Sequence, residues 1–292
     1  MRLAIVTSRD YARYHEDDLG LVDALAALGV ECTPGVWDDP DFAWTAHDAL
    51  LVRTPWDYYL RWSEFSAFLD RIERLGVRVV NPVATLRWNA DKRYLLELAA
   101  LGLPVVSTLL VERGDEPGLE AAVAAHRGGE VVVKPVVSGG AWRTWRFAAT
   151  DFAARVDAMR PALLAGAMLV QPYLPEIEEA GEWSLLFFGA RYSHAVLKRP
   201  RRGDFRVQEK HGGTHARDEP DAATRAAAQR VVDALPLAGH AGCLYARVDG
   251  VVRGGRFELM ELEVLEPQLF LAGRPAAARR FADVLVSALR TI

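Results

Sequence analysis

Acidic side chains recur at every second position in a stretch near residue 260. In Phe257–Val264 polar and apolar residues alternate as in a half-buried strand, so Glu261 and Glu263 fall on one face. Arg247 and Asp249, also two positions apart, lie in an alternating stretch just upstream, and glycines between the two stretches allow a tight turn. We therefore expect three carboxylates and one guanidinium to converge on the surface of a two-stranded hairpin.

The residues of this hairpin leave two interpretations open. Closely spaced carboxylates cannot all ionise without a cation, and hard oxygen ligands on a rigid sheet suit Mg²⁺. The alternative is a solvated acidic hairpin in which Arg247 is a surface partner of the acids. Residues that precede this hairpin in the sequence must decide between the two interpretations.

Lysines stand at the ends of two apolar strands. Lys134 directly follows the run Val131–Val133, and Lys198 closes the stretch that begins at Arg191. A lysine at the end of a buried strand needs an anionic partner, because an unpaired buried charge is costly. Lys92, near the start of a predicted helix, is unremarkable alone. Together with the acidic hairpin, the three lysines indicate a site for an anion and a metal.

Two polar loops could close over such an anion. Ser138, Gly139 and Gly140 follow an apolar strand and could present backbone N–H groups to phosphate oxygens. They lack the Walker A pattern, and a plain hairpin turn is the commoner explanation. Residues 199–213, which include Arg206, are rich in cations and form either a mobile surface loop or a lid over phosphates.

A proline follows the apolar strand near residue 170. Pro172 cannot occupy a central strand position, so the flanking peptide groups are free to hydrogen-bond a flat heterocycle, as an adenine slot requires. The flanking residues are Gln171, Tyr173 and Leu174, and Glu182 begins the next apolar strand.

Another polar loop follows the predicted strand 49–53. Ligands of open α/β sheets gather beyond the carboxyl ends of the strands. Arg53 could therefore hold a substrate carboxylate in a forked pair. Four neighbours could complete the pocket, namely Thr54, Trp56, Asp57 and Tyr58. The alternative is a proline-stiffened loop whose aromatic side chains only pack between domains.

The elements that would position these residues begin with a small α/β unit. In residues 1–84 strands and helices alternate, which is typical of a parallel sheet. The turn after the first strand contains no glycine, so a Rossmann dinucleotide site is excluded and substrate contacts are expected there. The expected strands are 3–7, 32–36, 49–53 and 77–80, and the expected helices are 19–28 and 63–75, the second capped by Ser63.

The rest of the chain mixes strands and helices. Expected strands are 105–111, 130–135, 168–174, 183–188, 191–198, 245–249 and 257–264. Expected helices are 89–101, 119–125, 150–164, 221–235 and 275–289.

Composition and charge exclude several classes of protein. A chain of 292 residues is long enough for two or three packed subdomains, and its net charge of −4 argues against nucleic-acid binding. Cys32 and Cys243 are far apart in sequence, so we expect reduced thiols in a cytoplasmic protein. No stretch is long enough to cross a bilayer, and no membrane partner is expected.

The order of these features resembles that of the ATP-grasp superfamily of carboxylate–amine ligases, over roughly residues 85 to 290. The matching residues are Lys92, Lys134-Pro135, Ser138-Gly139-Gly140, Gln171-Pro172-Tyr173-Leu174, Glu182, Lys198, Arg247-Val248-Asp249 and Glu261-Leu262-Glu263. The resemblance implies a mixed α/β and α+β fold in three parts. These are a Rossmann-like pre-ATP-grasp domain at 1–84, a small ATP-grasp subdomain with connecting helices at 85–170, and a large catalytic subdomain at 171–292.

The resemblance also implies a role for each matching residue. ATP phosphates would contact Lys92 and Lys134 beneath the 138–140 loop. Adenine would lie against Gln171, Tyr173 and Leu174, and the ribose against Glu182. Two Mg²⁺ ions would be carried by Asp249, Glu261 and Glu263. The catalytic cations would be Arg247, Lys198 and Arg206, with Arg247 facing the reacting carboxyl.

One departure from the superfamily pattern points to a particular branch of the superfamily. The commoner motif is Glu-x-Asn, whereas this chain has Glu261-Leu262-Glu263. With the stretches 53–58 and 203–208, the stretch 261–270 that contains this motif is most similar to the branch that closes O-ureido-D-serine into the antibiotic D-cycloserine. An ADP-forming ligase is implied, which activates a small amino-acid-like carboxylate as an acyl phosphate for attack by nitrogen. Dimers are common in this superfamily, so the resemblance makes a homodimer one possible assembly, but the sequence does not determine the oligomeric state. The alternatives are an intermolecular ligase, a kinase on the same scaffold and a non-catalytic ATP-binding module.

Overall fold

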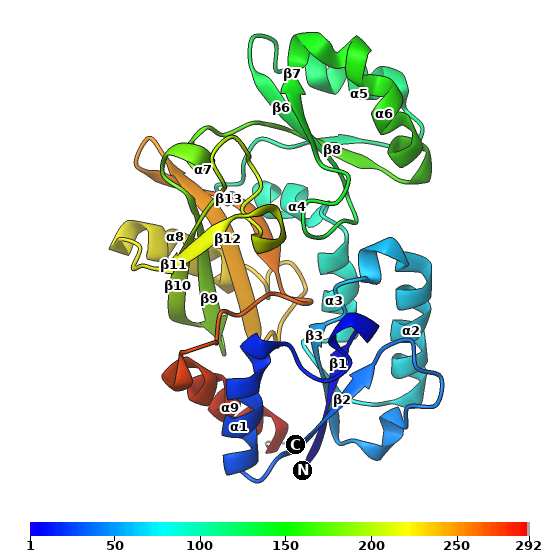
Figure 1. The fold of residues 1–292 in the computed structure, drawn as a ribbon, viewed down its shortest axis with the longest axis vertical. Coiled ribbons are helices and arrows are strands. Elements are labelled where there is room, and N and C mark those ends of the chain that lie inside the picture. Colours follow the sequence, from blue (N-terminus) through cyan, green and yellow to red (C-terminus); the bar gives the residue numbers. More distant parts are fainter. Residues whose placement is uncertain (291–292) are drawn as a thin grey trace.

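Residues 1–290, the part of the chain that the computed structural model describes, form three β-sheets with helices packed against them (Figure 1). The N-terminal sheet lies at one end of the molecule and the sheet of residues 109–172 at the other. Helices α3 (Val83–Ala90) and α4 (Tyr94–Ala100) connect the two ends along the chain. In this part of the chain, no helix has the length and apolar character needed to cross a bilayer.

The N-terminal sheet is parallel, with the strand order β2-β1-β3-β4. Its strands are β1 (Arg2–Thr7), β2 (Glu31–Val36), β3 (Ala49–Thr54) and β4 (Val79–Val80). The central strands β1 and β3 are apolar runs, because helices cover both faces of the sheet. One face packs against α1 (Glu16–Ala27) and the other against α2 (Trp62–Leu75) and α3. The predicted parallel unit is confirmed.

Helix ends in this unit differ in part from the predictions. Ser63 is not the cap of α2, because the chain becomes helical at Trp62 and Arg61 occupies the cap position. Gly76 ends the helix in a left-handed conformation with φ 66°, as predicted.

The second sheet is antiparallel, with the strand order β5-β8-β6-β7. Its strands are β5 (Leu109–Val111), β6 (Glu130–Pro135), β7 (Trp145–Ala148) and β8 (Met168–Pro172). Helices α5 (Glu116–Ala124) and α6 (Phe152–Ala165) share its apolar core. The predicted strand 105–111 is wrong at its start, because Val105 and Val106 instead contact Leu259 of the third sheet.

The third sheet is antiparallel, with the strand order β11-β10-β9-β12-β13. Its strands are β9 (Glu182–Phe188), β10 (Arg191–Arg199), β11 (Thr214–Arg217), β12 (Tyr245–Arg253) and β13 (Arg256–Glu263). One face packs against α8 (Ala222–Asp233). In the β12–β13 hairpin Arg247 lies opposite Glu263, and Asp249 lies opposite Glu261. The predicted hairpin is confirmed.

Helix α9 (Pro275–Arg290) returns to the N-terminal sheet. It packs against α1, and Phe281 shares an apolar core with Leu3, Leu25 and Tyr245. The predicted domain limits stay a prediction, although β8 spans residue 170 and α9 shares a core with the first sheet.

Candidate active site

A cavity of about 550 Å³ lies where parts of all three sheets approach one another. Its wall includes Trp56 from the loop after β3, Lys134 from β6, and Lys198 and Arg247 from the third sheet. Most of the residues that the sequence singled out therefore line one space, although they are distributed over the whole chain.

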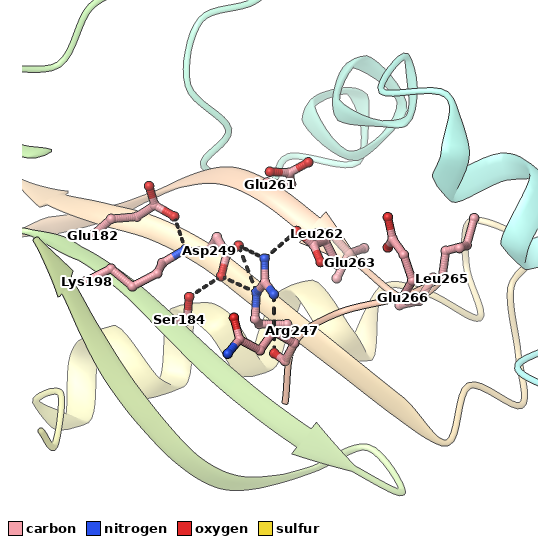
Figure 2. A network of polar contacts seen from close by, with 12 residues as sticks. Glu182, Ser184, Lys198, Arg247, Asp249, Glu261, Leu262, Glu263, Leu265 and Glu266 are labelled. Atoms are coloured by element: carbon pink, nitrogen blue, oxygen red, sulfur yellow. Dashed lines mark hydrogen bonds and ion pairs between the residues drawn. The ribbon is translucent and has the colours of Figure 1, made fainter. Parts of the chain in front are cut away.

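Three carboxylates of the β12–β13 hairpin come together at this cavity (Figure 2). Asp249, Glu261 and Glu263 each offer one oxygen, and these oxygens lie within 4.8 Å of one another. Asp249 is only 1% exposed, so the group is not a solvated surface hairpin. Three hard oxygen donors at this spacing fit a Mg²⁺ ion.

Arg247 is bound between two of these acids. Its Nη2 atom donates to Asp249 Oδ2 at 2.8 Å and also to Glu263, while Nη1 donates to the carbonyl of Gln268 at 3.2 Å. Burial lowers the pKa of Arg247, but the charges of Asp249 and Glu263 outweigh burial and raise it. The guanidinium therefore stays charged, and its orientation is fixed by several directed bonds.

Lys198 connects the same acids to β9. Its ammonium lies 2.5 Å from Glu182 and 3.5 Å from Asp249, and Ser184 donates to Asp249 at 2.5 Å. Burial lowers the pKa of Lys198, but Asp249 and Glu182 outweigh burial and raise it. Lys198 is therefore a charged group whose two carboxylate partners are within reach of the cavity.

Two lysines from other elements face Glu261. Lys92, between α3 and α4, lies 3.2 Å from Glu261 and donates to the carbonyl of Ser138. Lys134 makes no ion pair with any residue of the described chain, and burial lowers its pKa more than Glu261 raises it. Burial raises the pKa of Glu261, but Lys92 and Lys134 lower it by more. Two cations share one carboxylate here, so an anion such as phosphate would balance the charge.

The two polar loops of the sequence meet beside the cavity. The Nε2 atom of His211 hydrogen-bonds the carbonyl of Gly140 at 3.3 Å. Lys210 lies so close to Gly140 that a Cβ atom there would be 2.3 Å from its Nζ atom. Arg206 lines the cavity and donates to Asp204 at 2.8 Å. Residues 199–213 thus contact the 138–140 loop as a lid would.

An apolar slot adjoins the lysines. Its buried residues are Val106, Leu174, Ile177 of α7 (Glu176–Glu179) and Val207, with Met260 packed against them. The side chain of Gln171, which lines the cavity, donates to Thr108 at 2.8 Å. Tyr173 also packs against this cluster but does not line the cavity, because its ring lies against Arg146 and its hydroxyl donates to Glu178. Walls of this kind suit a flat base, to which Tyr173 could offer only backbone groups.

Two predicted substrate ligands do not reach the cavity. Arg53 is 1% exposed, and its Nε atom donates to Asp18 of α1 at 2.8 Å. Thr54 is also buried away from the cavity. The prediction that Arg53 binds a substrate carboxylate is wrong, because its side chain turns towards α1 at the end of β3. Trp56, Asp57 and Tyr58 of the same loop do line the cavity.

Other cavity residues were missed by the sequence reasoning. Tyr11 and His15 line the cavity and form an aromatic group with the predicted residue Trp56, with ring centroids 4.9 to 5.2 Å apart. Glu266 lines the cavity beyond β13, and burial raises its pKa despite the nearby charge of Lys92. These residues lie in loops without a repeating pattern, so only their position after strand ends could have identified them.

Comparisons with known proteins extend over the whole chain. A family model described as D-cycloserine synthetase DcsG, N-terminal domain, matches residues 3–81. The cycloserine biosynthesis protein DcsG of Streptomyces lavendulae is 32% identical, over 99% of this chain and 99% of that protein.

Solved structures give the same result. The crystal structure of D-cycloserine synthetase DcsG aligns with a TM-score of 0.89 at 28% identity, covering 99% of this chain and 100% of that one. A D-alanine–D-alanine ligase from Bacillus anthracis, complexed with ATP, aligns with a TM-score of 0.66 at 15% identity, covering 99% and 97% of the two chains. The second likeness concerns the fold alone.

Proposed function

This chain belongs to the DcsG family of ATP-grasp ligases, and from that premise we propose that it closes O-ureido-D-serine into D-cycloserine, releasing ADP and phosphate. The predicted ATP-grasp fold is confirmed by the same likeness. The observation that carries the proposal is the group formed by Asp249, Glu261 and Glu263 around Arg247, in a cavity that lysines also line.

The first step of the proposed reaction activates the substrate carboxylate. A carboxylate is a poor acyl donor, so transfer of the terminal phosphoryl group of ATP converts it into an acyl phosphate and releases ADP. Such a transfer needs positioning and charge neutralisation more than covalent help. Lys92, Lys134 and Arg206 would orient the phosphates beneath the two loops. When bound by Asp249, Glu261 and Glu263, Mg²⁺ would supply further neutralising charge.

The second step closes the ring. The oxygen-bound nitrogen of the ureido group attacks the acyl carbon, and phosphate leaves. Arg247 would stabilise the oxyanion, because a guanidinium stays protonated and offers directed donors. The ring nitrogen still carries the carbamoyl group, and water hydrolyses this N–C bond, so that carbamate leaves and D-cycloserine remains. Adenine would occupy the slot beside Leu174, and the lid would exclude water from the acyl phosphate.

Product analysis tests this proposal. The purified protein is supplied with ATP, Mg²⁺ and O-ureido-D-serine as the sole amino-acid substrate, and ADP, phosphate and D-cycloserine are measured, the last by mass spectrometry. We expect ADP, phosphate and D-cycloserine in equal amounts, and no ADP without O-ureido-D-serine.

Three results would contradict the proposal in different ways. A strict need for a second amino acid would indicate intermolecular ligation. A stable phosphorylated product without free phosphate would indicate a kinase. Nucleotide binding without ADP formation across a broad substrate panel would indicate a non-catalytic module.

A further inference from the structure

Glu266 differs from most other acids of the cavity because it forms no ion pair with a described residue. The paired acids are Asp57 with Arg61, Glu182 with Lys198, Glu209 with His215, Asp249 and Glu263 with Arg247, and Glu261 with Lys92. Among the lining acids of residues 1–290, Glu266 and Asp10 alone make no ion pair, and Asp10 is exposed to solvent. Burial and the charge of Glu266 raise the pKa of Tyr58, so its hydroxyl is a neutral neighbour; Lys92 is near enough for its charge to lower the pKa of Glu266 but forms its ion pair with Glu261.

The backbone around Glu266 is held by polar groups from four distant parts of the chain. The contacts are Trp56 Nε1 to the Glu266 carbonyl at 2.9 Å, Arg247 Nη1 to the Gln268 carbonyl at 3.2 Å, His194 Nε2 with the Leu269 carbonyl at 2.9 Å, and the Leu269 N–H to Asp17 at 3.0 Å. These bonds fix where the segment runs. They leave the carboxylate of Glu266 without an ion pair to any described residue, next to Glu263 in Figure 2. Fixed backbone of this kind is how a binding group is pre-positioned.

A ligand with a positive charge would remove the cost of this arrangement. A carboxylate in a confined site is unfavourable without a cation, whereas a charge-assisted hydrogen bond to an ammonium is strong. In an α-amino acid the ammonium is attached to the carbon next to the carboxyl. If the carboxyl lies at Arg247, its ammonium must lie close by. Glu266 is near enough to Arg247 for their charges to interact, yet the two are not bound to each other.

We propose that Glu266 binds the α-ammonium group of the amino-acid substrate and so selects α-amino acids over analogues that lack the ammonium. This inference rests on the proposed function, which places the substrate carboxyl at Arg247. The same contact keeps the amine protonated, and a protonated amine has no lone pair with which to attack an acyl phosphate. The ureido nitrogen is then the nucleophile that remains.

Binding measurements on two ligands and two proteins test the inference without requiring turnover. Wild type and Glu266→Gln, each loaded with Mg²⁺ and a non-hydrolysable ATP analogue, are titrated calorimetrically with O-ureido-D-serine and with its deamino analogue, 3-(ureidooxy)propanoate. We expect wild type to bind the amino acid at least about 30-fold more tightly than the analogue, and Glu266→Gln to bind both alike. The affinity of Glu266→Gln for the analogue should be close to that of wild type. If Glu266 had a purely structural role, the substitution would instead weaken the binding of both ligands by a similar factor.

Glu258→Gln is the matched control, because Glu258 lies on β13 but does not line the cavity. This variant should keep the wild-type preference. The inference is overturned if Glu266→Gln keeps that preference, if wild type shows none, or if wild type binds neither ligand. Failure of wild type to form D-cycloserine would instead contradict the proposed function, while the binding comparison would still decide the role of Glu266.

Discussion

Lys134 lies in the cavity without an ion pair to any described residue, and the charge of Glu261 does not offset its burial, so its charge should destabilise the protein when no nucleotide is bound. We expect Lys134→Met to raise the free energy of unfolding by about 1 kcal/mol and yet to lower kcat/KM for ATP by about 100-fold or more. Chemical unfolding and ADP release measure the two effects. Lys198→Met is the contrast, because it leaves Glu182 and Asp249 without a shared cation and should lower stability. Equal stability changes for the two variants would contradict this account.

The lowered pKa of Lys134 also predicts a dependence on pH. Burial moves this pKa below its ordinary value of 10.5, so at alkaline pH the unfolded chain binds a proton that the folded protein has lost. Stability therefore rises with pH between the folded and the unfolded pKa. The difference in free energy of unfolding between Lys134→Met and wild type should therefore become smaller as the pH approaches 10.5. Urea unfolding of both proteins at a series of alkaline pH values measures this difference. A difference that stays constant with pH would show that the charge of Lys134 does not cause the lower stability of wild type.

Arg247 offers a directed fork that a lysine cannot reproduce. Its bonds to Asp249, Glu263 and the Gln268 carbonyl fix its plane, so Arg247→Lys keeps the charge but loses the orientation. We expect kcat to fall by about 100-fold or more, because the oxyanion would lose its aligned donors. Steady-state ADP release measures the change. Arg253→Ala, which removes an arginine of the same strand that pairs with Glu176 at 3.4 Å, should leave kcat near wild type. A fall of only a few-fold for Arg247→Lys would exclude the proposed role.

Residue spacing predicted the acidic hairpin well and the substrate loop poorly. The alternation in β12 and β13 determines which side chains share a face, and that rule placed Arg247, Asp249 and Glu263 together. For Arg53 the rule that ligands gather at strand ends was insufficient, because Asp18 on α1 binds its side chain in the interior. Which partner a side chain finds depends on packing between elements, and the sequence does not display that packing.

Among the elements, the loop 199–213 depends on a close backbone approach at its end. A Cβ atom on Gly213 would lie 2.1 Å from the carbonyl oxygen of Val207, so Gly213→Ala must displace backbone. We expect a lid that closes poorly, which admits water to the acyl phosphate. The ratio of ADP released to D-cycloserine formed should rise severalfold.

Gly166→Ala is the control for this variant, because a Cβ atom there meets no atom within 4 Å. It should leave ADP and D-cycloserine in equal amounts. If Gly213→Ala also keeps them equal, the loop does not protect the intermediate.

Long elements were predicted more reliably than short ones. Strands with continuous or alternating apolar residues, such as β3 and β9, have the expected positions. The edge strand β11 was missed, because its four residues Thr214–Arg217 are all exposed and carry no apolar pattern. Its pairing with β10 depends on the neighbouring strand rather than on its own composition.

At the scale of the whole molecule, α9 joins the third sheet to the N-terminal sheet. Phe281 is fully buried, stacks on Phe188 of β9 and meets Tyr245 of β12 edge-on. Phe281→Ala should lower the free energy of unfolding by about 4 kcal/mol. Arg279→Ala, at an exposed position of the same helix, should change it by less than about 0.5 kcal/mol. Urea unfolding measures both, and similar values for the two variants would show that α9 is not part of the core.

The cavity is a property of the whole molecule as well. Asp17 on α1 accepts hydrogen bonds from the backbone of Leu269 and Ala272, and Asn81 donates to the carbonyls of Tyr245 and Val264. Such contacts join segments far apart in the chain, so local periodicity could not predict them. This is why the sequence predicted roles for the acids and lysines of the strands but none for Glu266, although its segment was part of the family resemblance.

The position of α9 has a consequence for how the protein is made. During synthesis β1 and α1 leave the ribosome before β13, and α9, which packs against α1, follows β13. Until then Leu3, Leu21 and Leu25 lack their final partners, so an apolar surface stays open on the nascent chain. The core on this face of the N-terminal sheet can therefore be completed only after α9 has been translated.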